Sequence, residues 1–558
     1  MSKVNGGKAV ASVLKANGVD CVFGLLGGSM LELYDALYAD DGIDYIGARD
    51  ERAAAHMADA YARIKGRIGV VLGAQAGPGV ANLVTGVAEA QLAYSPLVVI
   101  AGMITREHQG RDTFQEFDQV ALFAPICKKS IVVPLAARLP EMLTDAIRLA
   151  NSGRKGPVVL HVARDLFAEE FDMPDVAAPS AVEGAAPGDQ QIARIYELLA
   201  GASQPIIFAG GGFKWSHGSA DLQRLAEKLQ VPVVASTGHA DIMPHDHPLY
   251  AGQSGPRGNS VAARLTREAD VILALGNRLA FNSTFHSHDY VNADARIVQV
   301  DVEARAIGRY FPVAIGIQAD ARATAVALVS ASKKHSPDTR QWWAWREQFD
   351  RDKATLLDQR HSEARDESVP LLPVRVLGEI REAMPRDAIT TLDTGNTCLQ
   401  AADRLAHYQA PGLVAPLDFG LVGFGYAAAL GAQAAAPERP VICVMGDGGF
   451  GFTMTEITTA VQYKLWVIAI VIDNGAWGAE KAYQTQFFGA RLLGADIDSP
   501  DYSKVAELCG ARGYAVDQPG GTTAALQDAL AQKEPAVIHV KVDPNAIDAL
   551  RKDLFKKK

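Results

Sequence analysis

Short apolar runs alternate with amphipathic stretches along most of this chain of 558 residues. The runs at 441–445 and 466–472 have the length and the apolar content of buried strands. The stretches between such runs carry apolar residues at helical spacing. Because strands that alternate with helices are typical of parallel sheets covered by helices, we predict an α/β protein made of doubly wound parallel sheets.

Two segments interrupt this alternation and divide the chain. Residues 176–190 are rich in Ala, Pro and Gly without periodicity, which indicates a linker. Residues 333–368 are strongly charged. The remaining sequence falls into three blocks of ordinary domain size, 1–175, 190–332 and 370–545.

The charged segment also contains an aromatic pattern. Trp342, Trp345 and Phe349 stand at i, i+3 and i+7, so they share one face of a helix. Such a stripe could line a ligand site, but it is more often a packing face. We predict a helix between domains, with its aromatic side packed and its charged side in water.

Composition narrows the class of protein. The chain is too long for one core, and 48% hydrophobic with 21% charged residues is typical of a soluble globular protein. A net charge of −10 argues against a nucleic-acid or anionic membrane surface as partner. We find neither a signal peptide nor a bilayer-spanning stretch. Five scattered cysteines without a CxxC pair favour reduced thiols and a cytoplasmic location.

Candidate ligand residues follow two of the apolar runs. Gly446-Asp447-Gly448 comes directly after the run at 441–445, and Asp473-Asn474 ends the run at 466–472. Parallel strands meet at their carboxyl ends, where ligands bind in open α/β sheets. Carboxylate and amide oxygens suit Mg²⁺, and glycines let backbone N–H groups approach a phosphate. A lone GDG is an ordinary turn, so the order and the strand context carry this prediction.

This combination resembles the thiamin diphosphate motif, in which GDG and a later Asn hold the metal and the diphosphate. The usual form ends in Asn-Asn, whereas this chain has Asp473 at the first position. The resemblance implies Mg²⁺ ligands from Asp447, Asn474 and the backbone carbonyl of Ala476. It also implies diphosphate contacts along Gly446, Asp447, Gly448 and Gly449.

The three blocks match the layout of the thiamin diphosphate decarboxylase and acetolactate synthase superfamily. Its domains are pyrimidine-binding, central Rossmann-like and diphosphate-binding. Two further segments of the third block, at 393–397 and 418–425, resemble cofactor-contacting loops of that superfamily. The resemblance implies cofactor contacts from Gly395, Asn396, Thr397, the carbonyl of Gly420, and Val422, whose side chain would lie between the cofactor rings.

In the first block, Glu51 is the candidate catalytic acid. It follows a strand-like run and opens the helix-like stretch 51–63. On its own it could simply favour the positive end of that helix, by about 0.3–1 kcal/mol. The strand-Glu-helix order resembles the superfamily signature. The resemblance implies that Glu51 faces the aminopyrimidine nitrogen and lets the cofactor form its ylid.

Gln115 is the second candidate of the first block. Phe114-Gln115-Glu116 resembles the FQE segment of acetolactate synthases. Gln115 could donate a hydrogen bond to a substrate or an intermediate, or it could be a satisfied loop amide. The loops at 27–29 and 77–79 resemble segments that line the substrate side of the cofactor.

The run after Asn474 bears on the substrate. Trp477, Glu480 and Lys481 depart from the acetolactate synthase pattern, and the run resembles sulfoacetaldehyde acetyltransferase, whose acceptor is inorganic phosphate. Lys481 and Arg491 could bind an anionic substrate or be solvated. We expect an enzyme that cleaves or forms C–C bonds of a 2-oxo acid or related small carbonyl compound. An acetolactate synthase-like carboligase is the alternative, and a non-catalytic cofactor-binding homologue is the alternative of another class.

The central block leaves its ligand open. Gly210-Gly211-Gly212 follows a strand and Asp301 ends another, but the strict GxGxxG spacing of a dinucleotide site is absent. Superfamily members hold flavin, adenosine diphosphate or nothing there, and a nicotinamide oxidoreductase is a further alternative. The family cofactor lies between the first block of one chain and the third block of another. The resemblance therefore implies a homodimer or homotetramer.

Overall fold

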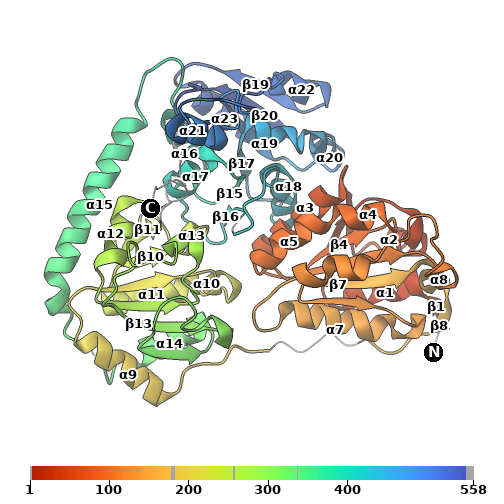
Figure 1. The fold of residues 1–558 in the computed structure, drawn as a ribbon, viewed down its shortest axis with the longest axis horizontal. Coiled ribbons are helices and arrows are strands. Elements are labelled where there is room, and N and C mark those ends of the chain that lie inside the picture. The colour runs from red at the N-terminus through yellow and green to blue at the C-terminus, as the bar shows by residue number, and fades with distance from the viewer. Residues whose placement is uncertain (1–2, 177–181, 256–257, 336, 417, 548–558) are drawn as a thin grey trace.

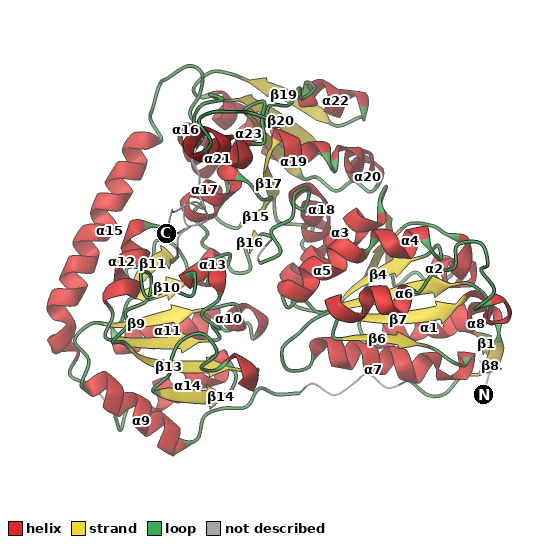
Figure 2. Ribbon diagram, viewed as in Figure 1, coloured by secondary structure: helices red, strands yellow, loops and turns green. Residues whose placement is uncertain are grey.

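The computed structural model describes residues 3–176, 182–255, 258–335, 337–416 and 418–547. Three six-stranded sheets, each parallel throughout, form the centres of three domains (Figures 1 and 2). A short antiparallel pair, β1 (Lys3–Asn5) with β8 (Glu170–Asp172), adjoins the first. The predicted α/β class with three parallel-sheet domains is confirmed. None of the helices within the described ranges is long and apolar enough to cross a membrane.

The first sheet has the strand order β3-β2-β4-β5-β7-β6. Its strands are β2 (Cys21–Gly24), β3 (Asp44–Gly47), β4 (Gly69–Gly73), β5 (Leu97–Met103), β6 (Lys129–Val132) and β7 (Val158–Ala163). Its helices are α1 (Gly6–Ala16), α2 (Leu31–Tyr38), α3 (Glu51–Lys65), α4 (Pro78–Asn82), α5 (Val84–Leu92), α6 (Gln119–Phe123), α7 (Leu139–Asn151) and α8 (Arg164–Ala168).

The central sheet has the order β11-β10-β9-β12-β13-β14, so the chain reverses direction across the sheet between β9 and β12. Its strands are β9 (Pro205–Ala209), β10 (Val233–Ala235), β11 (Tyr250–Gln253), β12 (Val271–Leu275), β13 (Arg296–Asp301) and β14 (Ile315–Gln318). Its helices are α9 (Asp189–Ala200), α10 (Gly212–Trp215), α11 (Ser219–Leu229), α12 (Ser260–Glu268), α13 (Phe281–Thr284) and α14 (Ala321–Ala331).

The third sheet has the order β16-β15-β17-β18-β20-β19. Its strands are β15 (Ile389–Leu392), β16 (Leu413–Val414), β17 (Val441–Gly446), β18 (Ile468–Asp473), β19 (Arg512–Val516) and β20 (Ala536–Lys541). Its helices are α16 (Pro373–Ala383), α17 (Asn396–Arg404), α18 (Gly425–Ala435), α19 (Asp447–Gly451), α20 (Ile457–Gln462), α21 (Gly478–Phe487), α22 (Tyr502–Leu508) and α23 (Gly521–Gln532). The neighbours β17 and β18 pair in parallel with Gly446 opposite Ile472, so both predicted strands end at the same edge.

A long helix, α15 (Trp343–Glu363), connects the central and third domains. Trp345 and Phe349 are buried on it, as the aromatic pattern predicts. Trp342 is buried too, but it ends a 3₁₀ turn (Thr339–Trp342) that precedes the helix. Of the predicted linker, residues 177–181 lie outside the described residues, and residues 182–188 form neither helix nor strand. All five cysteines are unpaired.

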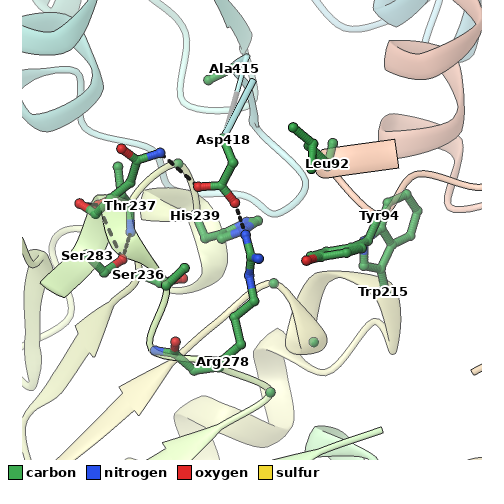
Figure 3. A pocket seen from close by; sticks show the side chains of 18 of the residues that line it. Leu92, Tyr94, Trp215, Ser236, Thr237, His239, Arg278, Ser283, Ala415 and Asp418 are labelled. Carbon is green, nitrogen blue, oxygen red and sulfur yellow. Dashed lines mark hydrogen bonds and ion pairs between the residues drawn. The ribbon is translucent and has the colours of Figure 1, made fainter. Parts of the chain in front are cut away.

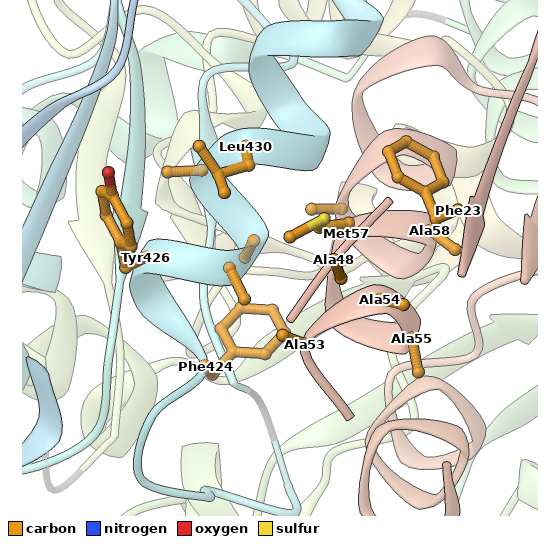
Figure 4. Close-up of a cluster of buried hydrophobic side chains, with 14 of the residues drawn as sticks. Phe23, Ala48, Ala53, Ala54, Ala55, Met57, Ala58, Phe424, Tyr426 and Leu430 are labelled. Carbon is orange, nitrogen blue, oxygen red and sulfur yellow. The ribbon is translucent and has the colours of Figure 1, made fainter. Parts of the chain in front are cut away.

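The first and third domains share one hydrophobic core. Helices α3 and α18 pack side by side, and small residues of both helices lie in the contact (Figure 4). A methyl group on Gly431 of α18 would lie 1.9 Å from the carbonyl oxygen of Met57 on α3, so the two backbones touch. The ring of His56 packs on Phe424, and burial lowers the pKa of His56 to about 3. These two domains therefore form a single packed unit within the chain.

Candidate active site

The carboxyl edge of the third sheet forms a pocket of about 250 Å³. Its walls come from the loops after β15, β17 and β18 and from the loop before α18. Among the described residues, neither Lys481 nor Arg491 lines this pocket. The structure does bring together there the metal- and cofactor-binding candidates of the third block: Gly395, Asn396, Thr397, Gly420, Val422, Gly446, Asp447, Gly448, Gly449, Asn474 and Ala476.

Asp447 lies at the centre of this edge, where β17 ends and α19 begins. Its side chain is buried, and the Ser499 hydroxyl donates to Oδ2 at 2.7 Å. The Tyr502 hydroxyl donates to the Asp447 carbonyl at 2.9 Å. Burial, with a contribution from the nearby charge of Asp473, raises the pKa of Asp447 to about 6. Ser499 and Tyr502 follow in a loop and a helix without a recognisable motif, so the sequence does not reveal them.

The unusual Asp473 has its own partners on the neighbouring strand β20. His539 Nε2 lies 2.7 Å and Lys541 Nζ 2.5 Å from Asp473 Oδ2, and the Gly475 N–H donates to Oδ1 at 2.8 Å. Burial opposes ionisation, but these hydrogen bonds prevail and lower the pKa of Asp473. The carboxylate is thus anchored inside the sheet, and the next residue, Asn474, lines the pocket.

Two helices of eight residues or more, α17 and α21, begin at the pocket. The first N–H groups of a helix lack partners within it, so such ends attract phosphate groups. Gly395, at the start of α17, has φ +116°, which side-chain-bearing residues rarely adopt. A Cβ on Gly448 would lie 2.6 Å from the Trp477 ring, so only glycine fits there. These features suit a diphosphate.

The loop that carries Gly420 and Val422 is held by a buried acid. The Asp393 carboxylate accepts backbone N–H groups from Gly423, at 3.0 and 3.1 Å, and from Phe424, at 3.1 Å. Burial raises the pKa of Asp393 to about 6. Asp393 therefore links the loop after β15 to the loop before α18, a role that the sequence pattern did not reveal.

Glu51 lies at the first turn of α3, directly after the N-cap Asp50. It is 8% exposed, and its Oε2 accepts a hydrogen bond from Asn82 Nδ2 at 2.9 Å. A Cβ on Gly79 would lie 3.0 Å from Glu51 Oε1, so a bare glycine faces that oxygen. Neither Glu51 nor Gln115 is among the described residues that line the third-domain pocket.

Three families match successive parts of the chain, in the order of its three sheets. They are described as thiamine pyrophosphate enzyme, N-terminal TPP binding domain (residues 4–122), central domain (192–328) and C-terminal TPP binding domain (393–540). The chain belongs to the thiamine pyrophosphate enzymes. It is therefore an enzyme that uses thiamine pyrophosphate, also called thiamin diphosphate, as the resemblance implied.

Named relatives cover nearly the whole of this thiamine pyrophosphate enzyme. Sulfoacetaldehyde acetyltransferase of Alcaligenes xylosoxydans xylosoxydans is 34% identical over 100% of this chain and 96% of its own. Acetolactate synthase isozyme 3 large subunit of Escherichia coli is 33% identical over 95% of this chain and 93% of its own. A probable acetolactate synthase large subunit of Methanococcus aeolicus is 31% identical over 97% of this chain and 93% of its own. The chain is thus about equally similar to both kinds of enzyme.

The donor set of this thiamine pyrophosphate enzyme fits a divalent cation. Within the described part of the chain, no Lys or Arg nitrogen forms an ion pair with the buried Asp447 carboxylate. A buried acid whose pKa is raised by burial and by a second carboxylate is stabilised in its charged form by a cation. The Asn474 amide oxygen and the Ala476 carbonyl would complete a set of hard oxygen ligands of the kind that Mg²⁺ prefers.

Gln115 lies in a loop of the first domain and has φ +67°. Its Oε1 accepts a hydrogen bond from Gln75 Nε2 at 2.6 Å. The next residue, Glu116, organises the loop: its carboxylate accepts backbone N–H groups from Gly110 at 2.5 Å and Thr113 at 3.0 Å. These hydrogen bonds lower the pKa of Glu116. Within the FQE segment, the side chain of Gln115 is thus held by Gln75, and the carboxylate of Glu116 holds the backbone of the loop.

The Glu116 carboxylate makes the order of this loop depend on pH. The pKa of Glu116 is lower in the folded state than in the unfolded state. The ionised carboxylate therefore stabilises the fold at pH values above its unfolded-state pKa, and this stabilisation is lost as the pH falls through its folded-state pKa. We expect Glu116→Gln to remove most of the protection of amides 110–113 at neutral pH, measured by hydrogen exchange with mass spectrometry. Glu141→Gln, whose partner is only the exposed Arg138, is the control. Unchanged protection in Glu116→Gln would contradict this role.

A second pocket, of about 210 Å³, lies where the three domains meet (Figure 3). It opens at the carboxyl ends of β9 and β12, the point where the order of the central sheet reverses and where such sheets bind ligands. Arg278 forms an ion pair with Asp418 of the third domain, and its guanidinium lies over Tyr94 of the first, 4.8 Å from the ring centre. Gly211, Gly212 and Asp301 of the central block also line it.

Proposed function

We propose that this protein is a thiamin diphosphate- and Mg²⁺-dependent acyl-transferring enzyme that resembles sulfoacetaldehyde acetyltransferase, with phosphate as acceptor. The observation that carries this proposal is the pocket wall beyond Asn474. There Trp477 lines the pocket together with Glu480 and Tyr483 of α21, and the run after Asn474 lacks the Leu-Gly-Met that is usual in acetolactate synthases. An acetolactate synthase-like carboligase is the second candidate, supported by the relative at 33% identity.

The residues of the chain have distinct tasks in this proposal. Bound thiamin diphosphate supplies a nucleophilic carbon that adds to a carbonyl group. Asp447, Asn474 and the Ala476 carbonyl would hold Mg²⁺, and the N-termini of α17 and α21 would hold the diphosphate. Glu51 would hold the proton at the pyrimidine ring nitrogen. Gln115 would donate a hydrogen bond to an oxygen of the substrate.

The charge near the pocket bears on an anionic substrate. Lys481 Nζ lies 2.7 Å from Asp496 Oδ1, so its charge is already paired. We therefore do not assign Lys481 to the substrate, and the helix N-terminus of α21 is the better candidate for a phosphate contact. A non-catalytic homologue is not favoured, because Glu51, Asp447 and Asn474 are all present.

An activity screen tests the substrate. The protein is incubated with thiamin diphosphate and Mg²⁺, with either sulfoacetaldehyde or pyruvate, and with or without phosphate. We expect acetyl phosphate only from sulfoacetaldehyde with phosphate. Formation of acetolactate from pyruvate without acetyl phosphate would support the carboligase instead. A protein inactive on both substrates would contradict both candidates.

We propose that two copies of the chain complete each site, in a homodimer or a homotetramer. The residues that line the third-domain pocket, among those the structure describes, lie between 394 and 483, whereas Glu51 belongs to the first domain. Mixing inactive Glu51→Gln chains with inactive Asp447→Asn chains tests this. Random pairing should restore about a quarter of wild-type activity, since half the dimers are hybrids with one intact site each. A site within one chain would restore none.

For the second pocket we propose a nucleotide such as flavin or adenosine diphosphate. Its position at the reversal of the central sheet supports this, and so do the glycines at 210–212, where side chains would collide with the strand-end backbone or His239. The visible absorbance of the purified protein distinguishes flavin from adenosine diphosphate.

Because all five cysteines are unpaired, we also propose a cytoplasmic location.

A further inference from the structure

Two glutamine side chains of the first domain form a chain of hydrogen bonds that begins at the backbone. The Gly28 N–H donates to Gln75 Oε1 at 2.9 Å, and Gln75 Nε2 donates to Gln115 Oε1 at 2.6 Å. We propose that Gln75 is a positioning residue that fixes the direction of the Gln115 amide, so that Gln115 presents only its NH₂ group to the substrate. This inference rests on the proposed function.

The direction of both amides follows from the first bond of the chain. A backbone N–H can only donate, so the Gln75 atom that meets Gly28 must be the oxygen. The other end of that amide, its NH₂, then points at Gln115. An NH₂ group can only donate as well, so the Gln115 atom that it meets is the oxygen. Gln115 Nε2 therefore lies on the opposite side of its amide, and no other described residue accepts its hydrogens.

The backbone around Gln115 is fixed together with its side chain. A Cβ on Gly77 would lie 2.6 Å from the Gln115 carbonyl oxygen, so the loop rests directly on the turn at 77–79. Gln115 has φ +67°, a conformation that costs a side-chain-bearing residue free energy and is kept only where the surroundings enforce it. Here the Glu116 carboxylate enforces it through its backbone hydrogen bonds.

The same turn brings Gln75 next to the candidate acid. A Cβ on Gly79 would lie 3.0 Å from both Gln75 Cβ and Glu51 Oε1, so these two side chains border one another across the glycine. Gln115, Gln75 and Glu51 thus share one edge of the first sheet. At that edge the ligand atom that meets Gln115 must accept a hydrogen bond, as a carbonyl, sulfonate or phosphate oxygen does, and a donor group is excluded.

Two substitutions of Gln75 distinguish this role from a structural one. In Gln75→Glu, Gly28 keeps an acceptor, but the second carboxylate oxygen faces Gln115 and requires its NH₂. The Gln115 amide then reverses and turns its oxygen toward the substrate. We expect kcat/KM to fall by about 10²-fold, the usual effect of losing one aimed donor. In Gln75→Met nothing fixes the direction of the Gln115 amide, but nothing reverses it either, so the fall in kcat/KM should be smaller.

Proton exchange at the thiazolium carbon, measured without substrate, is the internal control because Gln115 is not needed for it. We expect both Gln75 variants to exchange at the wild-type rate. A merely structural role predicts the opposite order of kcat/KM, with Gln75→Met worse, since Gln75→Glu keeps the hydrogen bond from Gly28. That order would overturn the proposal, as would slower exchange in Gln75→Glu, which would mean that the new charge acts through Glu51.

A double-mutant cycle on the cofactor-free protein gives a readout that does not depend on activity. Gln75→Glu and Gln115→Glu each keep one donor between the two side chains, so each alone should change the Tm little. Together they place two acceptors in contact, and at pH 8 the Tm should fall by more than the sum of the single losses. If the Tm loss of the double variant equals the sum of the two single losses, the two side chains are not hydrogen-bonded and the proposal is overturned. If wild-type protein shows no thiazolium exchange, the proposed function fails, but this cycle still decides whether the amides are linked.

Discussion

Glu51→Gln is expected to lower the rate of proton exchange at the thiazolium carbon by at least about 10²-fold, the effect of removing a general acid–base group. Glu51 is nearly buried at the first turn of α3, and one carboxylate oxygen is already bound by Asn82. The other oxygen borders the bare Gly79. Glutamine keeps the size and the Asn82 contact but cannot exchange a proton. Acid quenching of samples in deuterated buffer, followed by NMR of the released cofactor, measures the rate.

Glu32→Gln is the matched control for this experiment. Glu32 lies on α2 of the same domain, and its carboxylate pairs with Arg164 at 2.7 Å. It should exchange at the wild-type rate, and cofactor affinity should be similar in all three proteins. If Glu51→Gln also exchanges at that rate, Glu51 is not the acid, and another group must hold the proton.

Asp447→Asn is expected to weaken Mg²⁺-dependent cofactor binding by at least about 100-fold. Metal affinity falls by 10–100-fold when only a supporting residue of a metal site is removed, so a direct ligand should cost no less. The substitution takes away the carboxylate at the centre of the pocket but keeps its shape and the Ser499 contact. Titration calorimetry of the cofactor-free protein, with Mg²⁺ varied at fixed thiamin diphosphate, measures the change.

Asp473→Asn separates the loss of a ligand from the loss of a charge. Asp473 also has a carboxylate, at the end of the neighbouring strand β18, but His539 and Lys541 already bind it. Its substitution should lower the Tm, because it leaves those two groups short of their acceptor, and should weaken cofactor binding less than tenfold, or about 1.4 kcal/mol. Equal loss of affinity in both variants would mean that the pocket responds to its overall charge and that Asp447 is not a ligand.

The fold class could be read from the sequence because its signals are local. The run at 441–445 became β17 and the run at 466–472 became β18, with bounds shifted by one or two residues. Because parallel strands share one carboxyl edge, the sequence also predicts that Asp447 and Asn474 lie at the same edge. That β17 and β18 are direct neighbours is a finding of the structure. The first residue of the aromatic helix was harder to predict, since Trp342 belongs to a 3₁₀ turn that precedes the helix. The block limits 1–175, 190–332 and 370–545 stay predictions.

The supporting residues of the site could not be predicted, for a physical reason. His539 and Lys541 reach Asp473 only because β20 pairs with β18, and no local pattern encodes which strands pair. From the sequence, Asp393 is only the first residue of the segment 393–397, since its hydrogen bonds to the loop before α18 depend on how two distant loops meet. The link between Gln75 and Gln115 spans 40 positions of sequence and requires the turn at 77–79.

The backbone contact between α3 and α18 limits how this protein can respond to dilution. Because Gly431 touches the Met57 carbonyl, the two domains cannot slide past each other without breaking the shared core. Within one chain, Glu51 therefore cannot swing over the third-domain pocket of that chain. If each site needs two copies, specific activity should decline with protein concentration below the dissociation constant of the dimer. It should recover on reconcentration, since each separated chain keeps its first and third domains packed.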